Sequence, residues 1–254
     1  MIKFANDRSG RKGADPAPID ILIGCPIQKR DWIISEWFWH AVAACKVAGV
    51  KPGFLFVMDT SEEPLFTMVK NLSEINGVDL WIVPVEEVQR ADKRDWSHIR
   101  YERMVVLRNL LLEGVRELGP PLFLSLDSDM LLHEEAIKVL IDTLSEQDAQ
   151  AVGGKSYLSH TGRAHPTYAM IGYQNSLKRP DSEGTFKVDV LMAIKLMTPP
   201  AYNVDYEFHA HGEDIGWSLA CKREGLKLWW NGSVCSKHVM RVVDLDKIDA
   251  RAGF

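Results

Sequence analysis

Two aspartates one residue apart follow an apolar run in the middle of the chain. Asp127 and Asp129 flank Ser128 directly after residues 122–126, Leu-Phe-Leu-Ser-Leu. Carboxylate oxygens are hard ligands that suit a hard divalent cation, and such a cation can neutralise a diphosphate as it leaves a nucleotide sugar. Two aspartates on one turn can face a metal ion and a ribose together. The alternative is a helix cap, but the preceding buried strand favours a chemical role for this triplet.

A second acidic pair, Glu213 and Asp214, follows Gly212 where a helix is expected to begin. A carboxylate here could take the proton from an acceptor hydroxyl as a general base. The alternative is an ordinary helix start, since acidic residues in a first turn complement the helix dipole. Gly212 favours the chemical interpretation because it lets the backbone approach a substrate closely. Asp214, or failing that Glu213, is the predicted base, and Trp217 is expected to shape the acceptor pocket.

Charged and polar residues near the end of the chain are less specific. A single histidine such as His238 is more often structural than a ligand. Lys222, Arg223 and Lys227 could meet an anionic acceptor, including modified DNA, but a solvated helix face is the better explanation for them.

Alternating strand and helix patterns precede the acidic triplet. Strands are predicted at residues 19–25, 53–58, 79–83 and 122–126, and helices at 31–48, 63–75 and 99–118. This alternation predicts an α/β fold with a Rossmann-like, mostly parallel central sheet and helices on both faces. Because open α/β sheets bind ligands at the carboxyl ends of their strands, Asp127 is expected at a binding site.

The second half is less regular. It is predicted to hold a helix at 134–144, a strand at 151–157, a loop region at 159–184, an apolar run at 187–196, a helix at 213–224 and an apolar stretch at 226–230. We expect a smaller antiparallel part on the acceptor side. Residues 1–17 are predicted to form a flexible lead, and residues 18–254 a single catalytic domain. That domain divides into a nucleotide-sugar-binding half (18–130), an acceptor-binding half (131–240) and a tail (241–254).

The order and spacing of these motifs resemble the GT-A glycosyltransferases, family-2-like and DxD-containing, over residues 19–240. The resemblance rests on Asp127-Ser-Asp129 after a helix that carries Arg108-Asn109, on Gly212-Glu-Asp214 at a helix start, and on Gly225-x-Lys-Leu-Trp followed by His238. One departure is that the interval from Arg108 to Asp127 is longer than in the common family-2 pattern.

The resemblance implies a metal-dependent transfer of sugar from a nucleotide-diphosphate sugar, a UDP-sugar first, to a hydroxyl of a glycan or another acceptor. Asp129 would then ligate Mn²⁺ or Mg²⁺, with His238 as the third protein ligand, and Asp127 would contact the ribose or sugar and reach the metal through water. Ser128 belongs to the same donor turn. The loop from Pro26 through Gln28 to Arg30 would hold the nucleotide together with Asp59, and Arg108 would lie near the donor. A carboxylate on the acceptor side points to inversion at the sugar carbon.

Three other classes of protein compete with this interpretation. A nucleotidyltransferase usually carries a glycine-rich basic loop after its first strand, whereas residues 24–30 contain one glycine. A haloacid-dehalogenase-type phosphatase places its Asp-x-Asp after the first strand of the domain, whereas three predicted strand units precede the motif here. A non-catalytic carbohydrate-binding protein could use Trp217, Trp229 and Trp230 as stacking platforms, but both acidic motifs would be unexplained.

The composition of the chain argues against nucleic-acid-binding, membrane-spanning and secreted classes of protein. A formal net charge of −5 in 254 residues argues against a protein that holds nucleic acid by phosphate neutralisation alone. No apolar run reaches the roughly 18 residues of a membrane span, and the first residues lack the apolar region of a secretory signal. The four cysteines are widely spaced and are predicted to be free thiols, which favours a cytoplasmic location.

Overall fold

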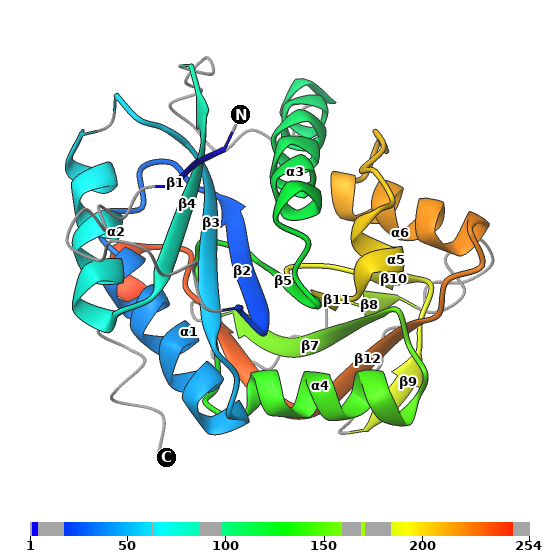
Figure 1. Ribbon diagram of the computed structural model, residues 1–254. Helices are drawn as coiled ribbons and strands as arrows, with labels where there is room; N and C mark the ends of the chain where they lie inside the picture. The colour runs from blue at the N-terminus through cyan, green and yellow to red at the C-terminus, as the bar shows by residue number, and fades with distance from the viewer. Residues whose placement is uncertain are drawn as a thin grey trace.

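The computed structural model describes residues 2–4, 18–61, 63–86, 98–158, 169–170 and 184–245. One ten-stranded sheet runs through the molecule, with helices on both of its faces (Figure 1). Its main path has the order β1 (Lys3–Phe4), β4 (Asp79–Val85), β3 (Pro52–Asp59), β2 (Ile21–Pro26), β5 (Leu122–Leu126), β11 (Ile194–Met197), β7 (Ala151–Leu158), β12 (Leu228–His238) and β6 (Met130–Leu131). β9 (Thr185–Lys187) pairs with β12, and β10 (Val190–Leu191) pairs with β8 (Ala169–Met170) in a separate two-stranded sheet.

The parallel half of the sheet contains β4, β3, β2 and β5 in neighbouring positions. The chain builds outward from β2 to β3 and β4 on one side, and then places β5 on the other side of β2. This reversal is a topological switch point, where the loops after two neighbouring parallel strands separate and leave room for a ligand. The loop after β2 and the turn that begins at Asp127 therefore face one another.

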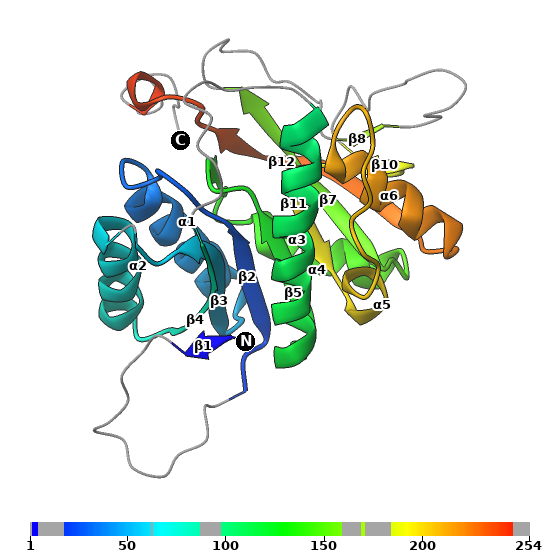
Figure 2. The ribbon, with the colours of Figure 1, turned by 90° about the horizontal axis from the view of Figure 1, so that it is seen from above.

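The helices divide between the two faces of the sheet (Figure 2). Along β2, Ile21 and Ile23 pack into one core and Leu22 into the other, as the alternation of a strand requires. The first core includes α1 (Ile34–Ala48), α2 (Glu63–Asn76) and α4 (Ala136–Glu146), and the second includes α3 (His98–Leu118), α5 (Pro199–Tyr202) and α6 (Glu213–Arg223). The predicted α/β class, with its mostly parallel sheet covered on both sides, is confirmed.

Helix α1 is fixed to the sheet by aromatic packing. Phe38 stacks on Phe54 of β3 with ring centroids 4.2 Å apart, and Trp37 lies 5.5 Å from the Phe56 ring. Full burial of one such side chain contributes roughly 1.5–3 kcal/mol. The helix ends at Gly49, whose left-handed φ of 70° lets its N–H cap the last turn. This packing sets the position of Trp37, which reaches the candidate site.

The second half continues the same sheet in a partly antiparallel manner, as expected. β11 lies antiparallel between β5 and β7, so the two halves share a continuous set of hydrogen bonds. The predicted single run at 187–196 is wrong in detail, because it comprises the last residue of β9, all of β10 and most of β11. The stretch predicted at 226–230 is instead the start of the 11-residue strand β12, whose register shifts between Asn231 and Cys235.

Three further findings bear on the sequence-based expectations. Residues 3 and 4 lie within the predicted flexible lead but pair with β4 as β1, and a 3-10 turn (Val242–Asp244) lies within the predicted tail. The four cysteines are free, as predicted. Burial raises the pKa of the Cys45 and Cys221 thiols to about 12, which makes them poor nucleophiles. In the described part of the chain, no helix has the length and hydropathy of a transmembrane helix.

Candidate functional site

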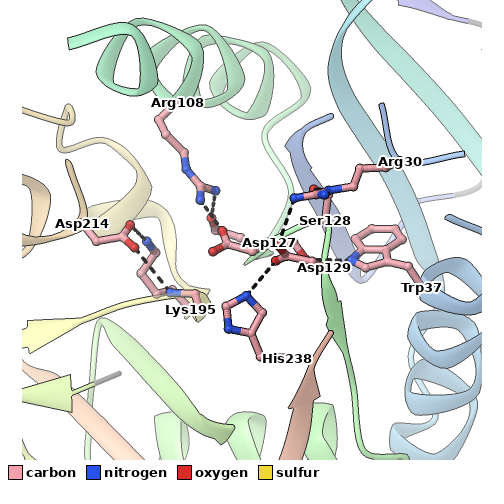
Figure 3. A network of polar contacts seen from close by, with 11 residues as sticks. Arg30, Trp37, Arg108, Asp127, Ser128, Asp129, Lys195, Asp214 and His238 are labelled. Atoms are coloured by element: carbon pink, nitrogen blue, oxygen red, sulfur yellow. Dashed lines mark hydrogen bonds and ion pairs between the residues drawn. The ribbon is translucent and has the colours of Figure 1, made fainter. Parts of the chain in front are cut away.

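The turn that carries the acidic triplet is held by backbone contacts from three sides. The Asp127 N–H donates to the Ala193 carbonyl at 3.1 Å, and Nε1 of Trp37 donates to the Asp127 carbonyl at 3.0 Å. On the other side, the Val239 N–H donates to the Asp129 carbonyl at 2.8 Å. The turn is thus anchored to the residue before β11, to helix α1 and to the end of β12, which leaves its side chains in a fixed place (Figure 3).

Side chains from two other parts of the chain contact the Asp129 carboxylate. Nη2 of Arg30, in the loop after β2, lies 3.0 Å from Oδ2 of Asp129, and Nε of Arg30 donates to Ser128 Oγ at 3.1 Å. Nε2 of His238, the last residue of β12, lies 3.2 Å from Oδ1 of Asp129. The structure therefore brings together Arg30, the Ser128-Asp129 pair and His238, which the sequence analysis selected from three segments about 100 residues apart.

Arg108 reaches the same turn from helix α3. Its guanidinium is buried, ion-pairs with Asp127 and donates to Ser125 Oγ at 3.1 Å. Burial lowers the pKa of Arg108, but the neighbouring Asp127 carboxylate outweighs this effect and raises it well above the usual value. Arg108 is a permanent cation beside the Asp127 turn, even though the interval to Asp127 is longer than the common pattern.

The other predicted nucleotide contacts lie at the same edge of the sheet. Pro26 is the last residue of β2, and Gln28 in the following loop accepts a hydrogen bond of 3.1 Å from Nη2 of Arg103 on α3. Asp59 ends β3, one strand away, and its Oδ1 accepts hydrogen bonds from the N–H and the hydroxyl of Ser61 at 2.8 and 2.7 Å. The nucleotide-binding roles of Pro26, Gln28 and Asp59 remain predictions.

The second acidic pair opens α6, as predicted, after Gly212 with φ 128° and ψ 153°. Asp214 forms an ion pair with Lys195 of β11 and accepts a long hydrogen bond of 3.4 Å from the Ala193 N–H. Burial raises the pKa of Asp214, but Lys195 outweighs this effect and lowers it overall. The pKa of the half-buried Glu213 is raised, first by burial and then by the negative charge of Asp214.

These opposite shifts separate the two carboxylates chemically. Asp214 stays ionised and holds its charge against Lys195, whereas Glu213 gains affinity for a proton. A general base works best when its pKa approaches the working pH. The ion pair of Asp214 with Lys195 and the raised pKa of Glu213 favour Glu213 as the proton acceptor, while the sequence analysis placed Asp214 first.

The predicted role of Trp217 in the acceptor pocket is wrong. The Trp217 side chain is fully buried and stacks on Tyr206 with ring centroids 5.9 Å apart, so it belongs to the core beneath the site. Trp230 is also fully buried and Trp229 is half-buried. A stacking platform built from these tryptophans, as a carbohydrate-binding module would need, is absent from this part of the structure.

The predicted cation site fits the side chains in part. Asp129 and His238 are adjacent and offer a carboxylate oxygen and an imidazole nitrogen, while the Asp127 carboxylate is paired with Arg108. Within the described residues, no group of three or more histidine, cysteine, aspartate or glutamate side chains is placed to hold a metal ion. Two protein ligands suit Mn²⁺ or Mg²⁺ if a substrate diphosphate and water complete the coordination, since Mg²⁺ usually keeps several waters and phosphate ligands.

Lys195 and Ala193 are among the residues of this network that were not selected from the sequence. Lys195 is fully buried beneath Asp214, and Ala193 bonds to both acidic motifs through its backbone. Lys195 had a signal, because it is the one charged residue in the otherwise apolar stretch 190–197. Ala193 had none, because its contribution comes from its peptide groups.

Comparison with known proteins bears on the fold. No family model and no curated protein sequence matches the chain. The solved structure of S. aureus TarS 1–349 in complex with UDP-GlcNAc matches with a TM-score of 0.62 and 12% identity, over 88% of this chain and 59% of that chain. The TarS 1–349 complex with UDP matches with a TM-score of 0.57 and 12% identity, over 91% and 63%. CMP:2-keto-3-deoxy-manno-octonic acid synthetase complexed with CTP matches with a TM-score of 0.54 and 12% identity, over 92% of this chain and 98% of that chain.

These likenesses have the same limit. At 12% identity they establish the fold alone, and the chain spans less than two thirds of both TarS chains. The chain has the Rossmann-like α/β fold that GT-A and nucleotidyltransferase structures share.

Proposed function

We propose that this protein is a glycosyltransferase that moves a sugar from a nucleotide-diphosphate sugar to an acceptor hydroxyl. One observation carries the proposal: the turn of Asp127 and Asp129 lies at the switch point of the sheet, and Arg108 sits between it and the second acidic pair. A transferase needs this arrangement, with charge stabilisation for a leaving diphosphate on one side and a proton acceptor on the other. The fold shared with TarS in complex with UDP-GlcNAc supports it.

The donor side would work by charge. Arg30 and Arg108 supply two guanidinium groups at the edge where the diphosphate would lie, and Arg is suited to phosphate oxygens because its planar fork can bind two of them. Asp129 and His238 would hold Mn²⁺ or Mg²⁺, and the bound cation would neutralise charge on the leaving diphosphate. Asp127, held by Arg108, would contact the ribose or the sugar.

The acceptor side would work by proton transfer. Glu213 would accept the proton of the acceptor hydroxyl while its oxygen forms the new bond to the anomeric carbon and the bond from that carbon to the diphosphate oxygen breaks. The electron pair of the broken bond leaves with the nucleoside diphosphate. Displacement in one step would invert the configuration of the sugar carbon.

The acceptor would be a glycan or another compound with a free hydroxyl, and hydroxylated DNA is a further candidate. A UDP-sugar is the first donor to test, because UDP-GlcNAc and UDP occupy the similar TarS structures. A cytoplasmic location belongs to the same proposal and is supported by the four free cysteines.

A nucleotidyltransferase is the second candidate, because the synthetase complexed with CTP is matched over 98% of its own length. The two reactions release different products. A glycosyltransferase releases a nucleoside diphosphate from a nucleotide sugar, whereas a nucleotidyltransferase releases pyrophosphate from a nucleoside triphosphate and a sugar.

The test is a binding screen followed by product analysis. UDP-, GDP- and CMP-sugars and CTP are added with Mn²⁺ while thermal unfolding is followed, and stabilising compounds are then incubated with the protein and analysed by ³¹P NMR. We expect a UDP-sugar to raise the Tm and to yield UDP slowly, with water as the acceptor. Asp129→Ala should abolish both effects, whereas Asp142→Ala on the exposed face of α4 should not. Release of pyrophosphate when CTP is added together with a sugar acid, without turnover of any nucleotide sugar, would contradict the proposal.

A further inference from the structure

Lys195 carries a positive charge into the interior of the protein. Its side chain is fully buried on β11, between Ile194 and Leu196 in the sheet. Nζ ion-pairs with Asp214 and lies 5.2 Å from the Tyr206 ring centroid and 5.4 Å from that of Trp217. An ammonium group without water requires such compensation, which a carboxylate and two aromatic faces provide here.

The ring that lies nearest to this ammonium is itself held in place. Asn109 of α3 donates from Nδ2 to the Tyr206 carbonyl at 3.0 Å and accepts from the Tyr206 N–H at 2.7 Å. Tyr206 stacks on Trp217, so the ammonium is enclosed by Tyr206 from the segment before α6 and by Trp217 and Asp214 of α6. Lys195 has little freedom to move toward or away from Asp214.

Asp214 connects this buried charge to the candidate active site. It faces Lys195 from β11, Arg108 from α3 and the Tyr206 ring. Glu213, the next residue, is near enough to Asp214, Arg108 and Asp127 for their charges to act on it, and Tyr101 of α3 lies beside the preceding Gly212. The negative charge of the Asp214 carboxylate therefore acts on the neighbouring Glu213 and helps to raise its pKa.

We infer that Lys195 is a positioning residue for the proposed sugar transfer: its buried ammonium holds the Asp214 carboxylate in place beside Glu213, the proposed proton acceptor. This inference rests on the proposed function. Lys195 does not touch the substrate, because its side chain is sealed beneath Asp214. It acts by fixing a negative charge that makes Glu213 a stronger base, and by keeping that charge from pairing with Arg108, which remains with Asp127.

A purely structural role would not need this pair. Buried ion pairs can often be replaced by apolar residues of similar size without loss of stability, since desolvation of two charges offsets their attraction. The same argument predicts that both charges of the pair can be removed together without loss of stability. Lys195→Met together with Asp214→Asn removes both charges and keeps both shapes.

The experiment compares Lys195→Met, Asp214→Asn and the double variant in turnover of the nucleotide sugar that the wild-type protein accepts. We measure kcat, the KM for the donor, and the pH at which kcat falls on the acid side. Lys195→Met should lower kcat about 10-fold or more, leave the donor KM within about 2-fold, and displace the acid-side fall in kcat. Lys195→Met should add no further loss in the Asp214→Asn background, because its effect passes through Asp214.

The exposed pair Lys138 and Asp142 on α4 supplies the matched control, with the same chemistry at the surface. Lys138→Met, alone or with Asp142→Asn, should keep the wild-type kcat and pH profile. The inference would be overturned if Lys195→Met had the wild-type kcat and the wild-type acid-side fall. It would also be overturned if Lys195→Met lowered kcat by the same factor in the Asp214→Asn background as in the wild-type protein. If Lys195→Met does not fold, the double variant decides. The double variant should have the same kcat as Asp214→Asn. A wild-type kcat for the double variant, or its failure to fold, would count against the positioning role of Lys195.

The two proposals fail in different ways. If the wild-type protein turns over no nucleotide sugar, the proposed function is rejected and the role of Lys195 falls with it. If the wild-type protein is active and the variants behave as it does, only the role of Lys195 is rejected.

Discussion

Nη2 of Arg30 lies 3.0 Å from Oδ2 of Asp129, and this ion pair joins the loop after β2 to the turn after β5 across the switch point of the sheet. The guanidinium is partly exposed and the carboxylate is buried. Arg30 is therefore within reach of a ligand at this edge while it is already held by the residue proposed to bind a cation.

Arg30→Met is expected to weaken nucleotide binding more than it weakens the fold. Loss of the guanidinium removes a phosphate contact, and the Kd for UDP in the presence of Mn²⁺ should rise about 10-fold, consistent with the roughly 1.5–3 kcal/mol of a charged hydrogen bond. A partly exposed ion pair contributes less, so the free energy of unfolding should change by about 1 kcal/mol or less. Calorimetric titration and urea unfolding measure the two quantities. Lys70→Met on α2, which removes an exposed charge, is the control, and an unchanged Kd for Arg30→Met would place Arg30 outside the donor site.

Asp129→Asn is expected to abolish the cation dependence of nucleotide binding. The amide keeps the shape and the contact to His238 but removes the charge that a hard cation prefers. UDP titrated with Mn²⁺ and with a chelator should give Kd values that differ about 10-fold or more in the wild-type protein and less than about 2-fold in the variant. Equal Mn²⁺ dependence in both proteins would show that Asp129 does not hold the cation.

Glu213→Gln is expected to lower kcat by about 100-fold, because the amide cannot accept a proton, with little change in donor affinity. Asp214→Asn should cause a smaller loss, since Asp214 acts through its charge. Single-turnover rates and UDP affinity separate the two effects. If Asp214→Asn were the more severe change, Asp214 would be the base, as the sequence alone suggests.

The pH dependence follows from the raised pKa of Glu213. A base must be ionised to act, so the rate should fall as pH decreases through that pKa, at a higher pH than the usual value of about 4.3 would give. The fall should be absent in Glu213→Gln. A kcat that is constant down to the ordinary range of a glutamate would contradict the environment described for this side chain.

Gly216→Ala is expected to destabilise the protein. A Cβ on Gly216 would overlap the carbonyl oxygen of Glu207, so the segment before α6 would have to shift. Such overpacking costs about 1–3 kcal/mol. Gly154→Ala is the control because its Cβ would meet its nearest neighbour at 3.6 Å, an ordinary contact. Urea unfolding compares the two variants, and equal stability would show that the Glu207 segment yields easily.

The parallel half of the fold was accessible from the sequence, because apolar runs bounded by glycine and proline alternate with longer amphipathic stretches. The position of Asp127 and Asp129 at the end of β5 followed from the same pattern. β12 was underestimated because Asn231-Gly232-Ser233 has the composition of a turn, whereas the structure absorbs it as an irregularity within the strand.

The contacts within the site were less accessible, since they join residues distant in sequence. His238 meets Asp129 only because β12 pairs with β6 beside the turn, and Lys195 meets Asp214 only because β11 is inserted antiparallel next to β5. Sequence motifs identify candidate acidic residues but do not show which other side chains contact them. The division of roles between Glu213 and Asp214 depends on which of them the buried lysine contacts.

The backbone of Ala193 connects the two acidic motifs of the site. Its carbonyl accepts from the Asp127 N–H and its own N–H donates to Asp214, so a single residue bonds to both acidic motifs. Its φ of 59° is unusual for a residue with a Cβ, at a cost of roughly 1–2 kcal/mol. The separation between the Asp127 turn and the start of α6 is therefore set in part by the backbone of this one residue.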